Sequence, residues 1–182
     1  MLLLLLILCG DVHPNPGPPN PEPTHSISIV HNNICSLQQK VPYVEAELTN
    51  FDIITLSETW LHDQFPKEKL DIKGYQPIIR LDRSDSAHGG VAIYVRDNLY
   101  CKHRPDLNVP YLEAVWIETK LNQEPLLVGC FYKSTRELVS YFDLIDESIR
   151  LALSTRHKVI ILGGFNSDCL GNTHRHIHNE HE

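Results

Sequence analysis

Polar side chains stand directly after apolar runs at several places in this sequence. The clearest case is KVIILGGFNSD, in which the apolar run Val159–Leu162 leads into two glycines and then into Asn166 and Asp168. A buried strand that ends at a site built from side chains at its carboxyl end has this pattern. Three other stretches share it: HNNICSL at 31–37, LSETWL at 56–61 and FYKS at 131–134. These strand ends are the candidate positions for chemistry.

Glu58 is a carboxylate that directly follows one of these apolar runs. Beside a wall of low dielectric it needs a cation or a hydrogen-bond network to stay ionised. An asparagine nearby, such as Asn33, supplies a neutral oxygen. One carboxylate with one amide oxygen is a sparse ligand set, typical of a Mg²⁺ ion that keeps several waters and takes phosphate oxygens from its substrate. Taken singly, the same residues are more simply explained as structural, with Glu58 as a loop carboxylate and Asn33 and Asn166 as turn residues.

The elements that must position these side chains follow from hydrophobic periodicity. In the first half of the chain, SISIV predicts a strand over 26–30, and the apolar run DIITL predicts a buried strand over 52–56. A helix is expected between them, with Pro42 in its first turn, where the missing N–H costs little. Its apolar stripe consists of Val41, Val44, Leu48 and Phe51.

The second half predicts strands at 89–97, 113–121 and 125–133, and a turn in NQEP joins the last two. The capping box STRE, Ser134–Glu137, then predicts the start of a helix. The apolar stripe of this helix consists of Leu138, Phe142, Ile145, Ile149 and Ala152. The run 159–162 is the last strand. The order strand, helix, several strands, helix, strand predicts an α/β fold in which packed sheets form a sandwich flanked by helices.

Composition limits the classes of protein to which the chain can belong. Its 182 residues are 42% hydrophobic, which is enough for one domain with a core. A net charge of -7 argues against holding DNA by general electrostatics, although a small or metal-bridged site is compatible with it. The five cysteines are an odd number and form no C-x-x-C pair, which argues against both a disulfide framework and a zinc site. A reducing compartment is therefore expected, in the cytoplasm or the nucleus.

Residues 1–23 are predicted to be a leader outside the fold. The apolar run Leu2–Cys9 is far shorter than the roughly 20 residues that span a bilayer. It lacks the preceding positive charge and the following cleavage pattern of a signal peptide, so secretion is only the alternative expectation. The segment Gly10–Pro23 is too rich in proline for a helix or a sheet.

Within this leader, GDVHPNPGP resembles the self-separating (2A-like) peptides, whose pattern is D-V/I-E-x-N-P-G-P. The resemblance implies that the ribosome skips the peptide bond between Gly17 and Pro18. His13 stands where the pattern has glutamate, which bears on the efficiency of skipping. A proline-rich linker is the alternative interpretation of this segment.

ITLSETWL, GGVAIYVRDNL, LLVGCFYKS and IILGGFNSD, in this order and spacing, resemble the endonuclease/exonuclease/phosphatase family. More narrowly, they resemble the endonuclease domain of LINE-type (non-LTR) retrotransposons, from about Ser26 to Leu170. The resemblance implies two sheets in a sandwich flanked by helices. It also implies cleavage of DNA phosphodiesters with bound Mg²⁺ or Mn²⁺, and a reverse transcriptase further along the intact polyprotein.

The same resemblance implies roles for individual residues. Glu58 in SETW corresponds to the principal metal ligand, and Asn33 to an asparagine that helps to hold the metal site. Tyr132 corresponds to a tyrosine that hydrogen-bonds the phosphate or orients its neighbours. Asn166 in GGFN corresponds to an asparagine that positions the attacking water or a phosphate oxygen. Arg83 is expected either to approach the nucleic acid or to be structural.

The sequence departs from the family pattern in two places. The family has G-D-F-N where this chain has GGFN, so Gly164 replaces an aspartate that is expected to activate the nucleophile. Losing such help commonly lowers a rate by about 10²–10⁴-fold. The family also continues to an Asp-His pair beyond this strand, whereas this sequence stops at Glu182. The C-terminal part of the domain is therefore expected to be missing.

These observations predict a leader at 1–23, a partial endonuclease domain at 24–170 and a His-rich tail at 171–182. The tail either binds a metal such as zinc or is unrelated terminal sequence. The domain is expected to be a degenerate fragment with impaired or no activity. A catalytically silent binding module and another phosphoesterase of the same superfamily remain the alternatives.

Overall fold

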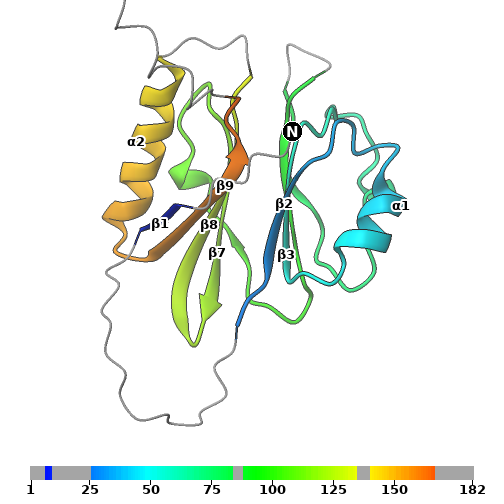
Figure 1. Ribbon diagram of the computed structural model, residues 1–182, viewed down its shortest axis with the longest axis horizontal. Coiled ribbons are helices and arrows are strands. Elements are labelled where there is room, and N and C mark those ends of the chain that lie inside the picture. Colours follow the sequence, from blue (N-terminus) through cyan, green and yellow to red (C-terminus); the bar gives the residue numbers. More distant parts are fainter. Residues whose placement is uncertain (1–6, 10–25, 84–87, 135–139, 167–182) are drawn as a thin grey trace, which may run out of the picture.

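A computed structural model describes residues 7–9, 26–83, 88–134 and 140–166 of the chain. Within these residues, two β-sheets pack face to face, and helices cover their outer faces (Figure 1). Helix α2 lies over one sheet, and the short helix α1 lies over the other. This arrangement is the predicted α/β sandwich flanked by helices.

The described residues of the first sheet form four strands in the order β2-β3-β5-β4. Their bounds are β2 Ile29–Asn33, β3 Ile53–Ser57, β4 Ile79–Leu81 and β5 Val91–Val95. Strands β2 and β3 run parallel, with Asn33 opposite Ser57. The chain crosses from β2 to β3 through α1 (Val41–Tyr43) and the π-helical turn η1 (Val44–Leu48), with proline in the first turn as predicted. A 3-10 turn, η2, follows at Lys67–Lys69.

The second sheet has the strand order β1-β9-β8-β7-β6 among the described residues. The bounds are β1 Ile7–Cys9, β6 Lys102–His103, β7 Glu113–Leu121, β8 Glu124–Tyr132 and β9 Lys158–Gly164. Helix α2, Tyr141–Ser154, connects the parallel strands β8 and β9, and the 3-10 turn η3, Pro105–Leu107, follows β6. A two-residue turn joins β7 to β8. Both of its residues, Asn122 and Gln123, have positive φ, as the hairpin turn that suits strand twist requires.

Three apolar clusters hold these layers together. One lies between the two sheets and includes Ile53, Ile93, Val128 and Leu162. A second lies under α1 and η1 on the outer face of the four-stranded sheet. The third lies under α2 and includes Trp116, which is fully buried. Burial on both faces explains why β3 and β5 consist of apolar or small residues throughout.

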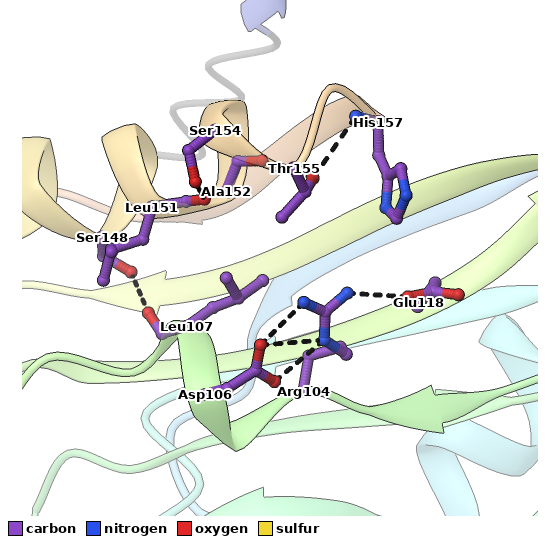
Figure 2. Close-up of polar contacts among 10 residues, drawn as sticks. All are labelled: Arg104, Asp106, Leu107, Glu118, Ser148, Leu151, Ala152, Ser154, Thr155 and His157. Atoms are coloured by element: carbon purple, nitrogen blue, oxygen red, sulfur yellow. Dashed lines mark hydrogen bonds and ion pairs between the residues drawn. The ribbon is translucent and has the colours of Figure 1, made fainter.

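Buried and half-buried polar contacts fix the edge of the sheet under α2 (Figure 2). The Ser148 hydroxyl on α2 donates to the Leu107 carbonyl at 2.7 Å and accepts the Trp116 indole N–H at 2.9 Å. The Arg104 guanidinium donates to Asp106 and, at 2.7 Å, to Glu118 on β7. These contacts attach the segment β6–η3 to both the helix and the sheet.

The observed elements differ from the predicted ones in several bounds. The first predicted strand, 26–30, lies at Ile29–Asn33, because pairing with β3 rather than local alternation sets its ends. The predicted capping box lies mostly outside the described residues, and the described part of the helix begins at Tyr141. Phe142 is exposed rather than part of the buried stripe, whereas Ile145 and Ala152 are buried as predicted. The short strands β4 and β6 have no clear signal in the sequence.

Strand β1 lies within the segment predicted to be a leader. Its backbone pairs antiparallel with β9, with Ile7 opposite Ile161 and Cys9 opposite Val159. The boundary at residue 23 and the separation between Gly17 and Pro18 stay predictions. Among the helices that the structure describes, none is long and apolar enough to cross a membrane.

Candidate active site

The candidate site lies where the carboxyl ends of two parallel strand pairs meet. In one sheet, Asn33 ends β2 and Glu58 directly follows β3. In the other sheet, Tyr132 ends β8 opposite Gly164 at the end of β9. Because the sheets pack face to face, these four positions come together although they are far apart in the sequence. The predicted strand-end arrangement thus brings Asn33, Glu58 and Tyr132 into one cluster.

The Glu58 carboxylate is the centre of this cluster. Its Oε1 accepts a hydrogen bond from Asn33 Nδ2 at 2.9 Å and another from the Tyr132 hydroxyl at 2.9 Å. The Cys35 thiol lies 3.5 Å from Oε2 and also donates to Asn33 Oδ1 at 3.2 Å. Oε1 is therefore taken up by protein donors, and Oε2 is the oxygen with more capacity for an external partner.

The environment of Glu58 favours its ionised form. Burial raises the pKa of this carboxyl, but the hydrogen bonds donated by Asn33, Tyr132 and Cys35 together outweigh it and leave the pKa below its ordinary value. Burial, followed by the hydrogen bond to Glu58, raises the pKa of Tyr132. At neutral pH the pair is a carboxylate and a phenol, so the tyrosine is the donor.

The loop that carries Glu58 has an unusual backbone. Glu58 and Trp60 have φ of 55° and 53°, in the left-handed region that non-glycine residues seldom adopt. The Trp60 amide donates to the Gly89 carbonyl at 2.9 Å, and the Glu58 carbonyl accepts the Ser36 amide at 2.9 Å. Strained conformations of this kind persist where surrounding contacts hold them, and they cluster at functional sites.

Asn166 lies at the same end of the sheet but is not bound to Glu58. Its side-chain Nδ2 donates to the Lys133 carbonyl at 2.8 Å, and its φ is 43°. The residue as a whole is exposed. Asp168 lies outside the described residues. The structure thus places Asn166 beside the site rather than within the hydrogen-bonded cluster.

Gly164 borders the cluster from the end of β9. A Cβ at this position would lie 3.3 Å from Ser57 Oγ and 3.4 Å from Tyr132 Cδ2, a tight fit that small movements of these side chains relieve. At the preceding residue, Gly163, a Cβ would lie 2.2 Å from the Phe131 carbonyl oxygen. Packing therefore requires glycine at 163 but does not require it at 164. A side chain at 164 would enter the space next to Ser57 and Tyr132.

Arg83 forms an ion pair with Glu113 at the rim of the site. The Glu113 carboxylate also accepts the Gly90 amide at 2.6 Å, so it links the β4–β5 loop to the start of β7. We expected Arg83 either to approach the nucleic acid or to be structural, and this ion pair gives it a structural role. Glu113 had no signal in the sequence because it stands at the start of an apolar strand.

His31 and Ser57 form a buried polar pair under the site that sequence reasoning also missed. Thr55 Oγ1 donates to the Val30 carbonyl at 3.0 Å, so its oxygen accepts from His31 Nδ1, 3.0 Å away. His31 Nε2 is then the acceptor for the Ser57 hydroxyl at 3.3 Å. Burial lowers the pKa of His31 to about 4, so the ring is neutral at physiological pH.

The donor set is compatible with a divalent metal ion bound mainly by oxygen. Glu58 Oε2 offers a charged ligand atom, and Asn33 Oδ1 offers a neutral one beside it. The described ranges contain no group of three or more His, Cys, Asp and Glu side chains that could enclose an ion. A site this sparse suits an ion that keeps several waters, as Mg²⁺ does.

The fold and the sequence both match known proteins. A profile described as the endonuclease/exonuclease/phosphatase family matches residues 33–180. The endonuclease domain of TRAS1, a telomere-specific non-LTR retrotransposon, superposes with a TM-score of 0.58 at 14% identity, covering 79% of this chain and 62% of that one. The human Nocturnin catalytic domain with bound sulfate gives 0.58 at 15% identity, covering 78% and 64%.

A third solved structure is the 3′ phosphatase NExo from Neisseria, bound to a product DNA hairpin. It gives a TM-score of 0.54 at 23% identity and covers 78% of this chain and 58% of that one. The chain thus spans less than two thirds of each of these three solved chains. No curated protein matches the sequence. Since the family profile covers most of the chain, from the end of β2 onward, this protein belongs to the endonuclease/exonuclease/phosphatase family.

Proposed function

We propose that this chain is a DNA-nicking endonuclease domain of a LINE-type retrotransposon polyprotein and that Gly164 weakens its activity. The observation that supports it best is the ionised Glu58 carboxylate, whose Oε1 is held by Asn33 and Tyr132. The family includes nucleases and phosphatases, so the choice of DNA rests on the sequence motifs that resemble retrotransposon endonucleases. In the intact element, a reverse transcriptase would follow this domain.

Nucleases of this family generally depend on a divalent metal ion. Here Glu58 Oε2 and Asn33 Oδ1 would hold Mg²⁺ or Mn²⁺, which when bound supplies Lewis-acid help at the scissile phosphate. The Tyr132 hydroxyl holds the Glu58 carboxylate by donating to Oε1, which would leave Oε2 as the ligand atom for the ion. The amide oxygen of the exposed Asn166 would orient a water or a phosphate group at the edge of the site.

The glycine at position 164 is the reason to propose that the activity is weak. With glycine at this position, residue 164 places no carboxylate in the space beside Ser57 and Tyr132, so an attacking water would receive no help from a base at this residue. The same feature favours a second candidate, a catalytically silent module that binds nucleic acid or protein. Activity of the wild-type chain in Mg²⁺ separates these two possibilities.

The test is nicking of supercoiled plasmid DNA in Mg²⁺ or Mn²⁺ by four proteins. Wild type should nick slowly and only with metal, Glu58→Gln should not nick, and Glu47→Gln on the exposed face of η1 should match wild type. Gly164→Asp should nick faster by about 10²–10⁴-fold, because a carboxylate then stands beside the site. Absence of nicking by both wild type and Gly164→Asp would overturn the proposal.

Phosphate release from small phosphomonoesters is measured in parallel. Release without plasmid nicking, lost in Glu58→Gln, would assign the chain to another phosphoesterase activity of the family. If Glu58→Gln nicks as wild type does, the activity belongs to a contaminant or to another site, and the role of Glu58 is wrong.

A further inference from the structure

Tyr111 is an aromatic residue that the fold leaves almost completely in solvent. It is 94% exposed, whereas the next most exposed large hydrophobic residue in the described part of the chain, Tyr100, is 46% exposed. A tyrosine that buries its ring contributes substantially to folding, because so much apolar surface leaves water. Tyr111 makes almost no such contribution, and its ring is open to a partner.

The backbone at Tyr111 is also unfavourable for a tyrosine. The Leu112 amide donates to the Val109 carbonyl at 3.2 Å and so closes a four-residue turn. Pro110 fixes a negative φ at the first central position, and Tyr111 has a φ of 67° at the second, as in a type II turn. Glycine or asparagine is the usual residue there, because other side chains are strained at positive φ. Neither backbone conformation nor packing therefore explains a tyrosine at this position.

The turn is anchored at both ends. Its first and last residues, Val109 and Leu112, are buried in the apolar cluster under α2. The next residue, Glu113, begins β7, and its amide donates to the Tyr141 hydroxyl at 2.8 Å. The Tyr141 hydroxyl in turn donates to the Tyr132 carbonyl at 3.2 Å. Two hydrogen bonds thus connect the base of the turn to the backbone of a residue in the candidate site.

These contacts place Tyr111 at the same edge of the molecule as Glu58. Glu113 lies opposite Tyr132 in the pairing of β7 with β8, and the Tyr132 hydroxyl donates to Glu58. Tyr111 precedes Glu113 by two residues, so it stands beyond this end of the five-stranded sheet. A nucleic-acid strand extends for several nucleotides on either side of the phosphate being cleaved. Such a strand, bound at Glu58, would continue across the edge that carries Tyr111.

We propose that Tyr111 is a substrate-binding residue, which packs its ring on a nucleotide of the DNA beyond the phosphate bound at Glu58. Every base has a π-face, so stacking on a tyrosine is tolerant of sequence. Tyrosine also supplies a large contact area at a low cost in conformational entropy, because few side-chain torsions must be fixed. The contact would favour a nucleic-acid strand over a small phosphomonoester. This inference rests on the proposed function.

The decisive variant is Tyr111→Gly, which removes the ring and relieves the backbone at the same time. It should bind a short labelled DNA duplex with unpaired ends about tenfold more weakly than wild type, the effect of losing one stacking contact. Its midpoint in urea should be no lower than that of wild type, because glycine suits this turn position. Fluorescence anisotropy in Ca²⁺, with cleavage monitored, measures the affinities.

Two further variants serve as controls. Tyr111→Phe keeps the ring and should bind the DNA as wild type does, because stacking does not need the hydroxyl. Tyr100→Leu removes an exposed aromatic ring beyond the far end of β5 and should also bind as wild type does. Equal losses of affinity in Tyr100→Leu and Tyr111→Gly would overturn the specific role of Tyr111.

The salt dependence of binding separates stacking from charge. A tyrosine ring releases no counterions from DNA, so the slope of log K against log salt should be the same in Tyr111→Gly and wild type. A shallower slope in the variant would mean that the substitution displaces charged groups that contact phosphates. Stacking by Tyr111 would then be the wrong explanation for any loss of affinity.

The outcomes distinguish this inference from the function on which it rests. If wild type binds the DNA and Tyr111→Gly binds it equally well, the role of Tyr111 is wrong and the proposed function stands. If Tyr111→Gly has a lower midpoint in urea, the tyrosine stabilises the fold, and the inference is overturned as well. If wild type does not bind the DNA, whether or not it releases phosphate from small phosphoesters, the proposed function fails, and the role of Tyr111 with it.

Discussion

The Tyr132 hydroxyl donates to Glu58 Oε1 at 2.9 Å and so joins the two sheets at the candidate site. Tyr132 ends β8 in the five-stranded sheet, and Glu58 follows β3 in the four-stranded one. The contact therefore depends on how the sheets pack, as well as on the local structure of either strand. Removing the Tyr132 hydroxyl therefore tests the geometry of the candidate site directly.

Tyr132→Phe should raise the pKa of Glu58, because one of the hydrogen bonds that stabilise the carboxylate is lost. A carboxyl whose pKa is depressed by folding stabilises the fold above its unfolded pKa, and this stabilisation is lost as pH falls through the folded value. The variant should therefore lose less stability on acidification than wild type. Carbon-detected NMR of the Glu58 side chain measures the pKa directly.

The control for this substitution is Tyr43→Phe, which removes a hydroxyl from an exposed tyrosine on α1. Glu58 should titrate as in wild type in this variant. An unchanged Glu58 pKa in Tyr132→Phe would show that the tyrosine does not donate to this carboxylate in solution.

The low pKa of the buried His31 predicts that the fold loses stability in mild acid. Its pKa is lowered from 6.5 to about 4 by burial, so between these values the unfolded chain binds a proton that the folded chain does not. Stability should fall as pH drops from 6.5 toward 4, by at most about 1.4 kcal/mol per pH unit from this group. Urea denaturation at pH 7, 6, 5 and 4.5 measures the slope.

His31→Gln should reduce this slope, because the titrating group is gone. His103→Gln, on the exposed strand β6, retains His31 and should retain the slope. Equal slopes in all three proteins would mean that His31 is not responsible for the acid sensitivity.

Two serines on α2 give a matched comparison of buried and exposed hydroxyls (Figure 2). Ser148 is fully buried and bonded to both Trp116 and Leu107, so Ser148→Ala leaves an indole N–H and a carbonyl without that partner. We expect a loss of about 1–3 kcal/mol in the free energy of unfolding. Ser154→Ala, at the exposed end of the helix, should change it by less than about 0.5 kcal/mol. Urea denaturation of both proteins makes the comparison, and similar values would contradict the packing under α2.

Two glycines with the same backbone angle separate backbone strain from collision. Gly74 and Gly90 both have φ of +85°, but a Cβ at 74 meets nothing within 4 Å, whereas at 90 it would lie 2.5 Å from Thr59 Oγ1. Gly74→Ala should lower the free energy of unfolding by about 1–2 kcal/mol, because alanine is strained in the left-handed conformation. Gly90→Ala should lower the free energy of unfolding by about 1–3 kcal/mol more, because the new methyl group would overlap Thr59, which is buried and has little room to move. Thermal unfolding monitored by circular dichroism ranks the two.

Much of the fold could be predicted because its elements carry local signals. The apolar run of β3, the alternation in β5 and the helix with proline in its first turn all follow from periodicity. Strand-end reasoning also selected Asn33, Glu58 and Tyr132, which the structure brings together, because parallel strands present their carboxyl ends at one edge of a sheet.

The remaining contacts depend on pairings that no local pattern specifies. His31 pairs with Thr55 because β2 and β3 lie in one register, and Glu113 reaches Gly90 only when the sheets pack. Phe142 satisfies the helical periodicity but lies on the exposed face, since the orientation of α2 is set by Tyr141, Ile145 and Ala152. Asn166 has a signal in the sequence, yet its anchor is a backbone carbonyl, which sequence cannot reveal.

The hairpin β7–β8 and the contact between Glu58 and Tyr132 differ greatly in the sequence separation of the residues that they join. A two-residue turn closes the hairpin, and such hairpins form in about 1–10 μs. Glu58 and Tyr132 are 74 residues apart, so the chain must close a long loop before they meet. We therefore expect the candidate site to assemble after the hairpin that holds Tyr132. A treatment that separates the two sheets would break this contact, whereas the β7–β8 hairpin lies within one sheet and does not depend on it.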